Sequence, residues 1–324
     1  MEKVADKLCT MWLISSMKVP TEDLRAKQLS LGCLGLMCCV IQPGCSTDRD
    51  SQITRDSLPP IRSSSTGMQF VVVRGGTFAM GSPPGEPERD NNEAQHQVTV
   101  TRSFYLGVYE VTQGEFTKVM GYNPSTVRGS ARLPVQTVSW FDAVSFCNGL
   151  SQLDGLDVAY EISNVRMDGL HVTNADVHWI FCSKGYRLPT EGEWELACRA
   201  GTTTPFSFGE TVTSDQANFD GLTPYNGGAN GQFRNYPLAV DAFPVSAFGL
   251  SQMSGNVFEW VWDYYGQYPT KHQVDPTGPE HGTERVRRGG AYPSPAHHMR
   301  SAVRHGVPAS AALFHHGFRV ARNG

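Results

Sequence analysis

The amino-acid sequence predicts an α+β fold that is rich in irregular loops. Short segments of β-branched or alternating residues are typical of strands, and three amphipathic segments begin at residues that cap helices. A long run at 201–250, rich in Gly, Asn, Thr and Pro, shows little periodicity of either kind. Irregular chain of this length within one domain is usually functional or held by an additional element, often a metal ion.

The predicted strands are short and separated by turns. They lie at 68–73, 75–81, 98–101, 104–109, 160–162 and 178–182, with an aromatic-dense core strand within 249–263. We expect the segments 98–101 and 104–109 to be neighbours.

Three helices are predicted from the residues that precede them. They are 113–120, 140 to about 153, and 191–200, with Thr112, Ser139 and Thr190 as the caps. Glu193 follows Thr190 by three residues, which is the spacing of a capping box. Cys147 and Cys198 lie on the inner faces of the last two helices, and we interpret both as small core residues.

Composition places the chain among globular proteins. Of its 324 residues 40% are hydrophobic and 18% are charged, with 33 Gly and 20 Pro, so one large domain or two ordinary ones are possible. The net charge of −4 argues against nucleic acid as a partner.

The first 45 residues differ from the rest and predict a leader. Arg25 and Lys27 precede an apolar run at 29–41 that is too short for an ordinary membrane span. Gly44 before Cys45 is typical of a lipoprotein processing site, so Cys45 is the predicted lipidation site. The alternative is a buried or misannotated N-terminal extension. Met17 is a candidate for the true start, since the residues before it are unrelated to a signal.

The domain organisation follows from this leader. We predict a leader at 1–45, a flexible tether at 46–66 and a folded domain at 67–324. The protein would then be exported to the cell envelope and held by a lipid anchor in the outer membrane or at the cell surface.

The last forty residues contain three regular blocks and two irregular fillers. The blocks are 288–292, 300–304 and 317–321, and the fillers are 293–299 and 305–316. Five of the ten histidines lie in the fillers, which we predict to be loops carried by the blocks. We interpret Arg300 and Arg304 as structural ion-pair partners.

The order of motifs resembles the formylglycine-generating enzyme family, also called the sulfatase-modifying-factor domain. The matching stretches are 75–81 (GGTFAMG), 109–115 (YEVTQGE), 134–140 (PVQTVSW), 186–194 (YRLPTEGEW), 197–201 (ACRAG), 255–260 (GNVFEW), 288–290 (RGG) and 317–319 (GFR). They span about residues 67–322. The resemblance implies a C-type-lectin-like formylglycine-generating-enzyme fold with abundant irregular structure.

The resemblance also implies structural calcium. The side chains that match the family's ligands are Asn218, Gln252 and Glu259, and the carbonyl groups are those of Phe219, Gly255 and Val257. An oxygen-only ligand set suits calcium. Gln252 stands where Asn is usual, and no Asp clearly matches in the loop near Asn230.

The family's enzymes bind copper through two cysteines near the carboxyl end. This chain has no cysteine after Cys198, so we expect no copper and assign no catalytic residue. Ser301 and Val320 stand where the structural disulfide partners of Cys147 and Cys198 would be. The histidine pairs at 297–298 and 315–316 could bind Zn²⁺ or copper, but adjacent strand residues point to opposite faces, which favours exposed loop histidines without a metal.

A narrower resemblance is to the variable proteins of diversity-generating retroelements, including Treponema variable lipoproteins. In those proteins adenine-directed mutagenesis rewrites Asn codons, which can yield Ser, Pro, His, Leu, Phe, Ala, Val or Gly. The fillers contain only such residues, apart from Met299, which would be a fixed position. The predicted ligand-binding residues are Ser294, Ala296, His297, His298, Val303, His305, Val307, Ala309, Ser310, Leu313, Phe314, His315 and His316.

Together these features predict an exported, non-catalytic protein that binds a protein or glycan ligand at the cell surface. Two alternatives stay open. One is an enzyme of the same family with a chemistry that does not use cysteine, and the other is a structural subunit of the cell envelope.

Overall fold

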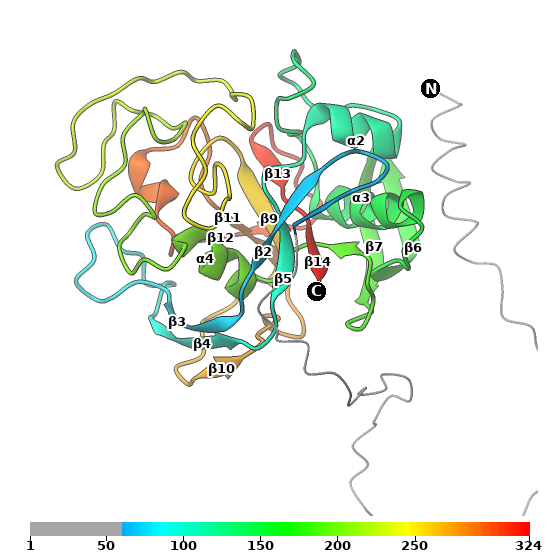
Figure 1. Ribbon diagram of the computed structural model, residues 1–324, viewed down its shortest axis with the longest axis horizontal. Helices are drawn as coiled ribbons and strands as arrows, with labels where there is room; N and C mark the ends of the chain where they lie inside the picture. The colour runs from blue at the N-terminus through cyan, green and yellow to red at the C-terminus, as the bar shows by residue number, and fades with distance from the viewer. Residues whose placement is uncertain (1–59) are drawn as a thin grey trace, which may run out of the picture. The chain divides into compact units, whose positions relative to one another are not determined.

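Three helices and four small sheets build the part of the chain that the structure, a computed structural model, describes: residues 60–324 (Figure 1). Strand β9 runs through the middle. On one side of it lie α2, α3 and the β6–β7 pair, and on the other lie α4 and long loops (Figure 1). The predicted leader, Cys45 and residues 46–59 of the predicted tether lie outside the described residues.

Three of the four sheets combine strands that are distant in the sequence. The largest has the order β1 (Ile61–Arg62), β2 (Gln69–Val73), β5 (Phe104–Gly107), β14 (Ala321–Asn323) and β8 (Tyr186–Arg187). A second has the order β12 (Arg304–Pro308), β11 (Glu284–Arg288), β9 (Phe258–Tyr264) and β13 (His316–Phe318). A third consists of β10 (Gln273–Val274), β4 (His96–Val100) and β3 (Gly76–Met80), and the fourth of β6 (Tyr160–Asp168) and β7 (His171–Trp179).

The three predicted helices are confirmed together with their caps. They are α2 (Gln113–Met120), α3 (Trp140–Leu153) and α4 (Glu191–Arg199). Thr112, Ser139 and Thr190 each accept a hydrogen bond from the backbone N–H three residues later, and an acidic side chain there bonds back to the cap. This reciprocal pairing satisfies amide groups that a helix end otherwise leaves free.

The structure differs from the sequence predictions in three respects: the pairing of one strand, the extent of two others, and the start of the folded domain. Segment 104–109 does not pair with 98–101, because β5 lies between β2 and β14. The short strands predicted at 160–162 and 178–182 belong to one long antiparallel hairpin, β6–β7. The folded domain begins before residue 67, since β1 pairs with β2 and turns back through Ser63, whose backbone N–H donates to Met68.

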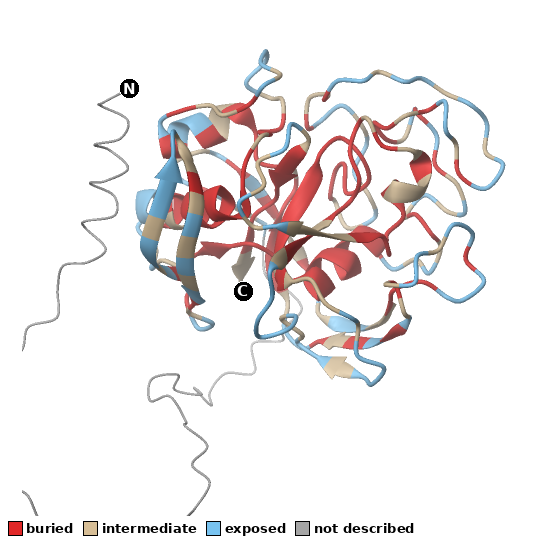
Figure 2. Ribbon diagram, turned by 180° about the vertical axis from the view of Figure 1, so that it is seen from behind, coloured by how far each residue is buried: buried red, intermediate tan, exposed pale blue. Residues whose placement is uncertain are grey.

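The hydrophobic core surrounds α4 and the middle of β9. Trp194 of α4 is fully buried beside Leu106, Val261 and Val286, and Figure 2 shows these elements as mostly buried. A second cluster lies beneath the irregular run 201–250. Its members are Phe206, Val212, Ala217, Phe219, Tyr225, Ala296 and Met299. In this cluster, side chains of the irregular run pack against Ala296 and Met299 of the carboxyl-terminal segment.

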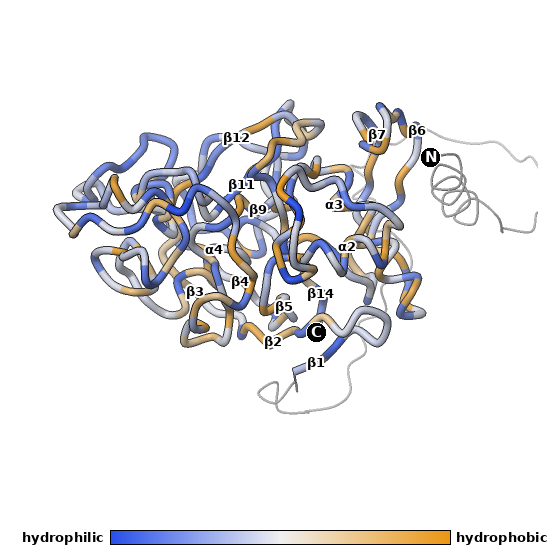
Figure 3. The backbone as a smooth tube through the Cα atoms, turned by 90° about the horizontal axis from the view of Figure 1, so that it is seen from above, coloured by the Kyte–Doolittle hydropathy of each residue, from blue (hydrophilic) through white to orange (hydrophobic). Residues whose placement is uncertain are grey.

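Hydrophobic residues are distributed in short stretches along residues 60–324 (Figure 3). Within residues 60–324, no helix has the length and apolar character needed to cross a membrane.

Candidate ligand-binding surface

Four arginines of the carboxyl-terminal segment are buried and paired with carboxylates from other elements. The pairs are Arg288 with Glu195, Arg300 with Glu93 at 2.8 Å, Arg304 with Glu191 at 2.7 Å, and Arg319 with Glu259 at 2.7 Å. A guanidinium group can donate two parallel hydrogen bonds to one carboxylate, which fixes its position and orientation. The prediction that Arg300 and Arg304 are structural is therefore confirmed, and the regular blocks are anchored in the core.

The chain reaches the surface between these anchors. The fillers are only partly loops: residues 296–299 form a short 3₁₀ helix, η1 (Ala296–Met299), and much of the second filler belongs to β12 or begins β13. Ser310, Leu313 and Phe314 are exposed. The half-buried predicted residues are His297, His298, His305, Val307, Ala309 and His315.

Four predicted binding residues are buried and cannot contact a ligand in this conformation. Ala296 packs in the cluster beneath the irregular run, and Val303 is only 1% exposed. The carbonyl oxygen of Ser294 accepts from the backbone N–H of Asp220. His316 begins β13, which pairs with β9 in the core. Met299, the residue that no rewritten Asn codon can encode, is also fully buried.

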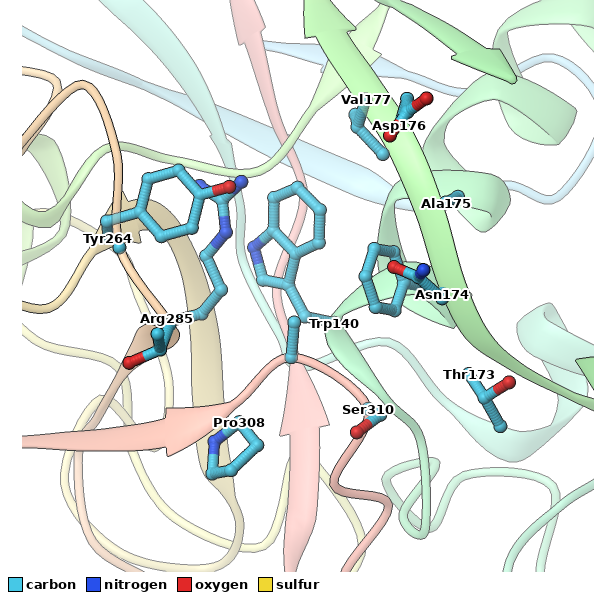
Figure 4. Close-up of a pocket in the computed structure, with 14 residues that line it drawn as sticks. Trp140, Thr173, Asn174, Ala175, Asp176, Val177, Tyr264, Arg285, Pro308 and Ser310 are labelled. Carbon is cyan, nitrogen blue, oxygen red and sulfur yellow. The ribbon is translucent and has the colours of Figure 1, made fainter. Parts of the chain in front are cut away.

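A cleft of about 340 Å³ lies beside the second filler (Figure 4). Pro308, Ala309 and Ser310 form one wall, and residues 173–177 of β7 form the opposite wall. At its floor the guanidinium carbon of Arg285 lies 3.8 Å from the centre of the Trp140 ring and 3.4 Å from that of Tyr264. Burial lowers the pKa of Arg285 to about 10, and the group stays cationic at neutral pH.

Sequence reasoning did not find this cleft. Its lining comes from α3, β7, β9, β11, β12 and adjoining loops. The hairpin that supplies residues 173–177 has few apolar residues to indicate a strand. The one signal in the sequence is Arg285, a cation close to the aromatic run that ends at Tyr264 and Tyr265.

Histidines gather around the buried Phe258 ring, beneath the second filler. We call Arg287, His298, His305, His315 and His316 the histidine cluster. The Arg287 guanidinium lies 4.0 Å from the Phe258 ring centre, and the rings of His305 and His315 lie 5.5 and 5.4 Å from it. His298 is 4.9 Å from His305. Burial lowers the pKa of all four histidines, to about 4 for His298 and His315 and about 3 for His305 and His316.

The histidine cluster is poorly suited to a metal ion. Within residues 60–324, no group of three or more His, Cys, Asp or Glu side chains is arranged to hold one. Arg287 Nη1 donates to Nε2 of both His315 and His316, so these lone pairs are used and a positive charge already sits there. His297 pairs with Glu88 instead, at 3.1 Å.

The residues predicted to bind calcium fall into two groups. The amide oxygens Asn218 Oδ1 and Gln252 Oε1 are buried and have no hydrogen-bond partner, and such oxygens suit calcium. Glu259 does not fit, because Arg319 donates to both its oxygens, at 2.7 and 2.9 Å, and Trp194 Nε1 donates to one of them at 2.8 Å. The prediction of Glu259 as a ligand is corrected: its charge is neutralised by Arg319.

None of the three cysteines in residues 60–324 lines the cleft. Cys147 and Cys198 are buried and free, as predicted for core residues, and burial raises the pKa of the Cys198 thiol to about 11. A thiol with a raised pKa is a poor nucleophile and a poor metal ligand. Cys182 is exposed, in the turn after β7.

Comparison with protein families decides the assignment. The sulfatase-modifying factor enzyme 1-like domain matches residues 56–324. The chain belongs to this family.

Relatives within the family have different names. A chaperone protein LppX from Paenibacillus barcinonensis is 31% identical over 239 residues, covering 69% of this chain and 79% of that protein. The formylglycine-generating enzyme of Mycobacterium tuberculosis is 36% identical over 297 residues, covering 78% of this chain and 96% of that enzyme. The serine/threonine-protein kinase pkn1 of Chlamydia pneumoniae is 27% identical over 285 residues, but the chain spans only 38% of that kinase.

Among solved structures, Treponema denticola variable protein 1 is similar in fold and sequence. It superposes with a TM-score of 0.69 and 26% identity, covering 82% of this chain and 99% of that one. The predicted α+β, C-type-lectin-like fold of the formylglycine-generating enzymes is thereby confirmed.

Proposed function

We propose that this family member is a non-catalytic binding protein whose ligand contacts the surface between the anchored blocks of its carboxyl-terminal segment. One observation carries the proposal. Buried Arg–carboxylate pairs fix the blocks, while Leu313 and Phe314 are exposed and Ser310 is exposed at the edge of a cleft. Exposed aromatic and aliphatic side chains on a fixed scaffold are typical anchors of binding surfaces. The ligand is a protein or glycan at the cell surface.

The surface is proposed to be diversified by a retroelement. Similarity to Treponema denticola variable protein 1 over nearly its whole length supports this proposal. The residues between the blocks are those that rewritten Asn codons encode, and the exception, Met299, lies in the core, where a fixed residue is expected.

Absence of catalysis is part of the proposal. The chain has no cysteine after Cys198, so thiolate ligands for copper are missing from the segment that forms the surface. Copper titration tests this directly. Tight copper binding accompanied by oxygen consumption would contradict a binding protein and favour an enzyme with another chemistry.

Export and lipid attachment at Cys45 are proposed from the leader sequence alone. Incorporation of radiolabelled lipid should be lost in Cys45→Ala. Unchanged labelling of that variant would contradict the anchor in the outer membrane or at the cell surface.

We also propose a structural calcium ion, supported by the two unpaired amide oxygens. Asn218 and Gln252 would hold it, with the carbonyl groups of Phe219, Gly255 and Val257 as the further candidates. Calcium would neutralise these buried oxygen dipoles and fix the irregular loops that carry them.

The diversification proposal is tested by sequencing the DNA that flanks the gene. We expect a near-copy of the codons for residues 285–322, differing only where the copy has adenine, beside a reverse-transcriptase gene. If no copy exists and sibling strains have identical fillers, the surface is fixed. Binding is tested separately, by comparing the protein with a Leu313→Ser/Phe314→Ser variant on glycan arrays and on arrays of cell-surface protein ectodomains.

A further inference from the structure

Arg287 is a cation whose surroundings offer it no counter-charge. Within the described residues it forms no ion pair with a carboxylate, whereas its chain neighbour Arg288 pairs with Glu195. Its side chain is half-buried against the Phe258 ring. Burial alone lowers the pKa of Arg287, to about 10, so the group stays charged at neutral pH.

The proton positions in the histidine cluster can be assigned from its hydrogen bonds. A guanidinium group only donates, so His315 Nε2, at 3.0 Å from Arg287 Nη1, must accept. Burial keeps His315 neutral at pH 7, with a pKa of about 4, so its single ring proton lies on Nδ1. His316 has the same arrangement, with Nε2 accepting from Arg287 and Nδ1 donating to the Ala311 carbonyl oxygen at 3.1 Å.

Unpaired polar atoms remain around the Phe258 ring. Arg287 Nε and His315 Nδ1 both carry a hydrogen, both are buried, and neither has a hydrogen-bond partner. Nε2 of His305, the residue that pairs with Arg287 across β11 and β12, is also buried and unpaired. A buried donor without an acceptor is unfavourable, and native proteins leave few of them.

We propose that the histidine cluster binds a singly charged oxyanion of the ligand, a carboxylate or a sulfate monoester. Arg287 supplies the single positive charge and the Nε–H donor, while His315 supplies the Nδ1–H donor. His305, whose pKa burial lowers to about 3, is neutral and can turn its Nε2–H toward the same group. Charge-assisted hydrogen bonds of this kind are short and strong, and the planar oxyanion edge suits guanidinium donors.

The inference rests on the proposed binding function and adds the chemical class that the surface recognises. The histidine cluster is near the exposed part of the second filler, since the Phe314 and His315 rings lie 4.5 Å apart. A ligand that contacts Phe314 therefore lies beside His315. Because Arg287 Nε and His315 Nδ1 are buried, its acidic group reaches them only when neighbouring side chains move. A cation is disfavoured at the same place, because Arg287 already uses the imidazole lone pairs of His315 and His316.

The test is a titration of the full chain with small anions, followed by NMR of the imidazole signals. Sodium acetate and sodium methyl sulfate serve as separate probes at constant ionic strength and pH 7, with tetramethylammonium chloride as the cation control. We expect saturable shifts of the His305 and His315 signals, with a Kd on the order of 10 mM for such small probes. Acetate binding identifies a carboxylate site, and methyl sulfate binding identifies a sulfate-ester site.

Three variants locate the effect. Arg287→Met should weaken anion binding by at least about tenfold, and His315→Phe should weaken it several-fold while keeping the ring. Arg132→Met removes an exposed cation that pairs with Asp241 and should leave binding unchanged. Shifts that do not saturate, or that persist in Arg287→Met, would overturn the anion site. The array experiment with Leu313→Ser/Phe314→Ser tests the proposed binding function independently. Loss of the anion site would leave array binding through Leu313 and Phe314 intact, and loss of array binding would leave the anion titration intact.

Discussion

Cys198 and Ser301 face each other in the core, with Sγ and Oγ 3.5 Å apart. Cys198 lies in α4, and Ser301 lies two residues after the end of η1, 103 positions later in the chain. In the resembling family a second cysteine is expected where this chain has Ser301. The resemblance predicts a disulfide partner at position 301, and in this structure Ser301 contacts Cys198 without a covalent bond.

We predict that Ser301→Cys forms a disulfide with Cys198 under oxidising conditions. The side chains are already in contact, and a sulfur at 301 needs only a small adjustment to reach the S–S distance of about 2 Å. Closing a loop of this length is expected to raise the free energy of unfolding by about 2–4 kcal/mol. Mass spectrometry without reductant and denaturant unfolding provide the measurements. Cys198→Ala/Ser301→Cys is the control and should show no gain; a gain there would exclude the disulfide as its source.

The sequence predicts the helices and the order of the family motifs because each depends on local signals. Ser139 and Thr190 are caps with acidic residues three positions later, and this capping depends only on residues close in the sequence. The β6–β7 hairpin was largely missed because its strands are mostly exposed and lack alternating apolar residues. Pairing of β5 with β14 joins residues more than two hundred positions apart, and no local pattern encodes it.

The candidate site was predictable only in outline. Exposed Leu313 and Phe314 follow from an irregular segment between regular blocks. The burial of His316 cannot be predicted from the segment alone, because it depends on the pairing of β13 with β9. The sequence does not predict the pairing of Glu259 with Arg319 either, since the two residues are 60 positions apart and each belongs to a different motif.

Removal of the Arg300 side chain should destabilise the protein strongly. Arg300→Met leaves the carboxylates of Glu86 and Glu93 buried without their counter-charge, and breaking such a buried pair costs about 3–5 kcal/mol. Urea unfolding measures the loss. The matched control is Arg132→Met, whose exposed pair with Asp241 should contribute no more than about 1 kcal/mol. Equal losses in both variants would show that Arg300 is not an anchor.

Exposed and buried residues of the carboxyl-terminal segment should respond differently to polar substitution. Leu313→Ser and Phe314→Ser are expected to change the free energy of unfolding by no more than about 0.5 kcal/mol each, because both side chains are nearly half exposed. Val303→Ser should cost about 2 kcal/mol or more, since it places a hydroxyl in a packed core. Chemical denaturation of the three variants provides the comparison. Comparable losses at all three positions would mean that residues 313 and 314 are structural.

Calcium should raise the melting temperature if the proposed ion is present. Calcium at about a hundred times its Kd is expected to raise it by roughly 5 °C relative to EGTA, because only the folded state assembles the oxygens. Asn218→Ala and Gln252→Ala should each reduce this difference, whereas Asn164→Ala, on the exposed β6 strand, should not. A melting temperature that is the same in calcium and EGTA would remove the ion from the proposal.

Acid should destabilise the protein through His316. Burial, with Arg287 nearby, lowers the pKa of this histidine from 6.5 to about 3, so it is neutral when folded but takes up a proton when unfolded below pH 6.5. The unfolded state therefore binds more protons between those two pH values, and the free energy of unfolding falls as the pH falls. One such proton contributes at most about 1.4 kcal/mol per pH unit.

Substitution of His316 isolates this contribution from that of the carboxylates. His316→Gln keeps an acceptor for Arg287 but does not titrate, so its unfolding free energy should fall less steeply than that of the native chain between pH 6.5 and 4.5. Guanidinium unfolding at three pH values measures the two slopes. His281→Gln removes a histidine that is 89% exposed and should keep the native slope. If the difference between the native chain and His316→Gln stays constant with pH, His316 is not the group that links acid to unfolding.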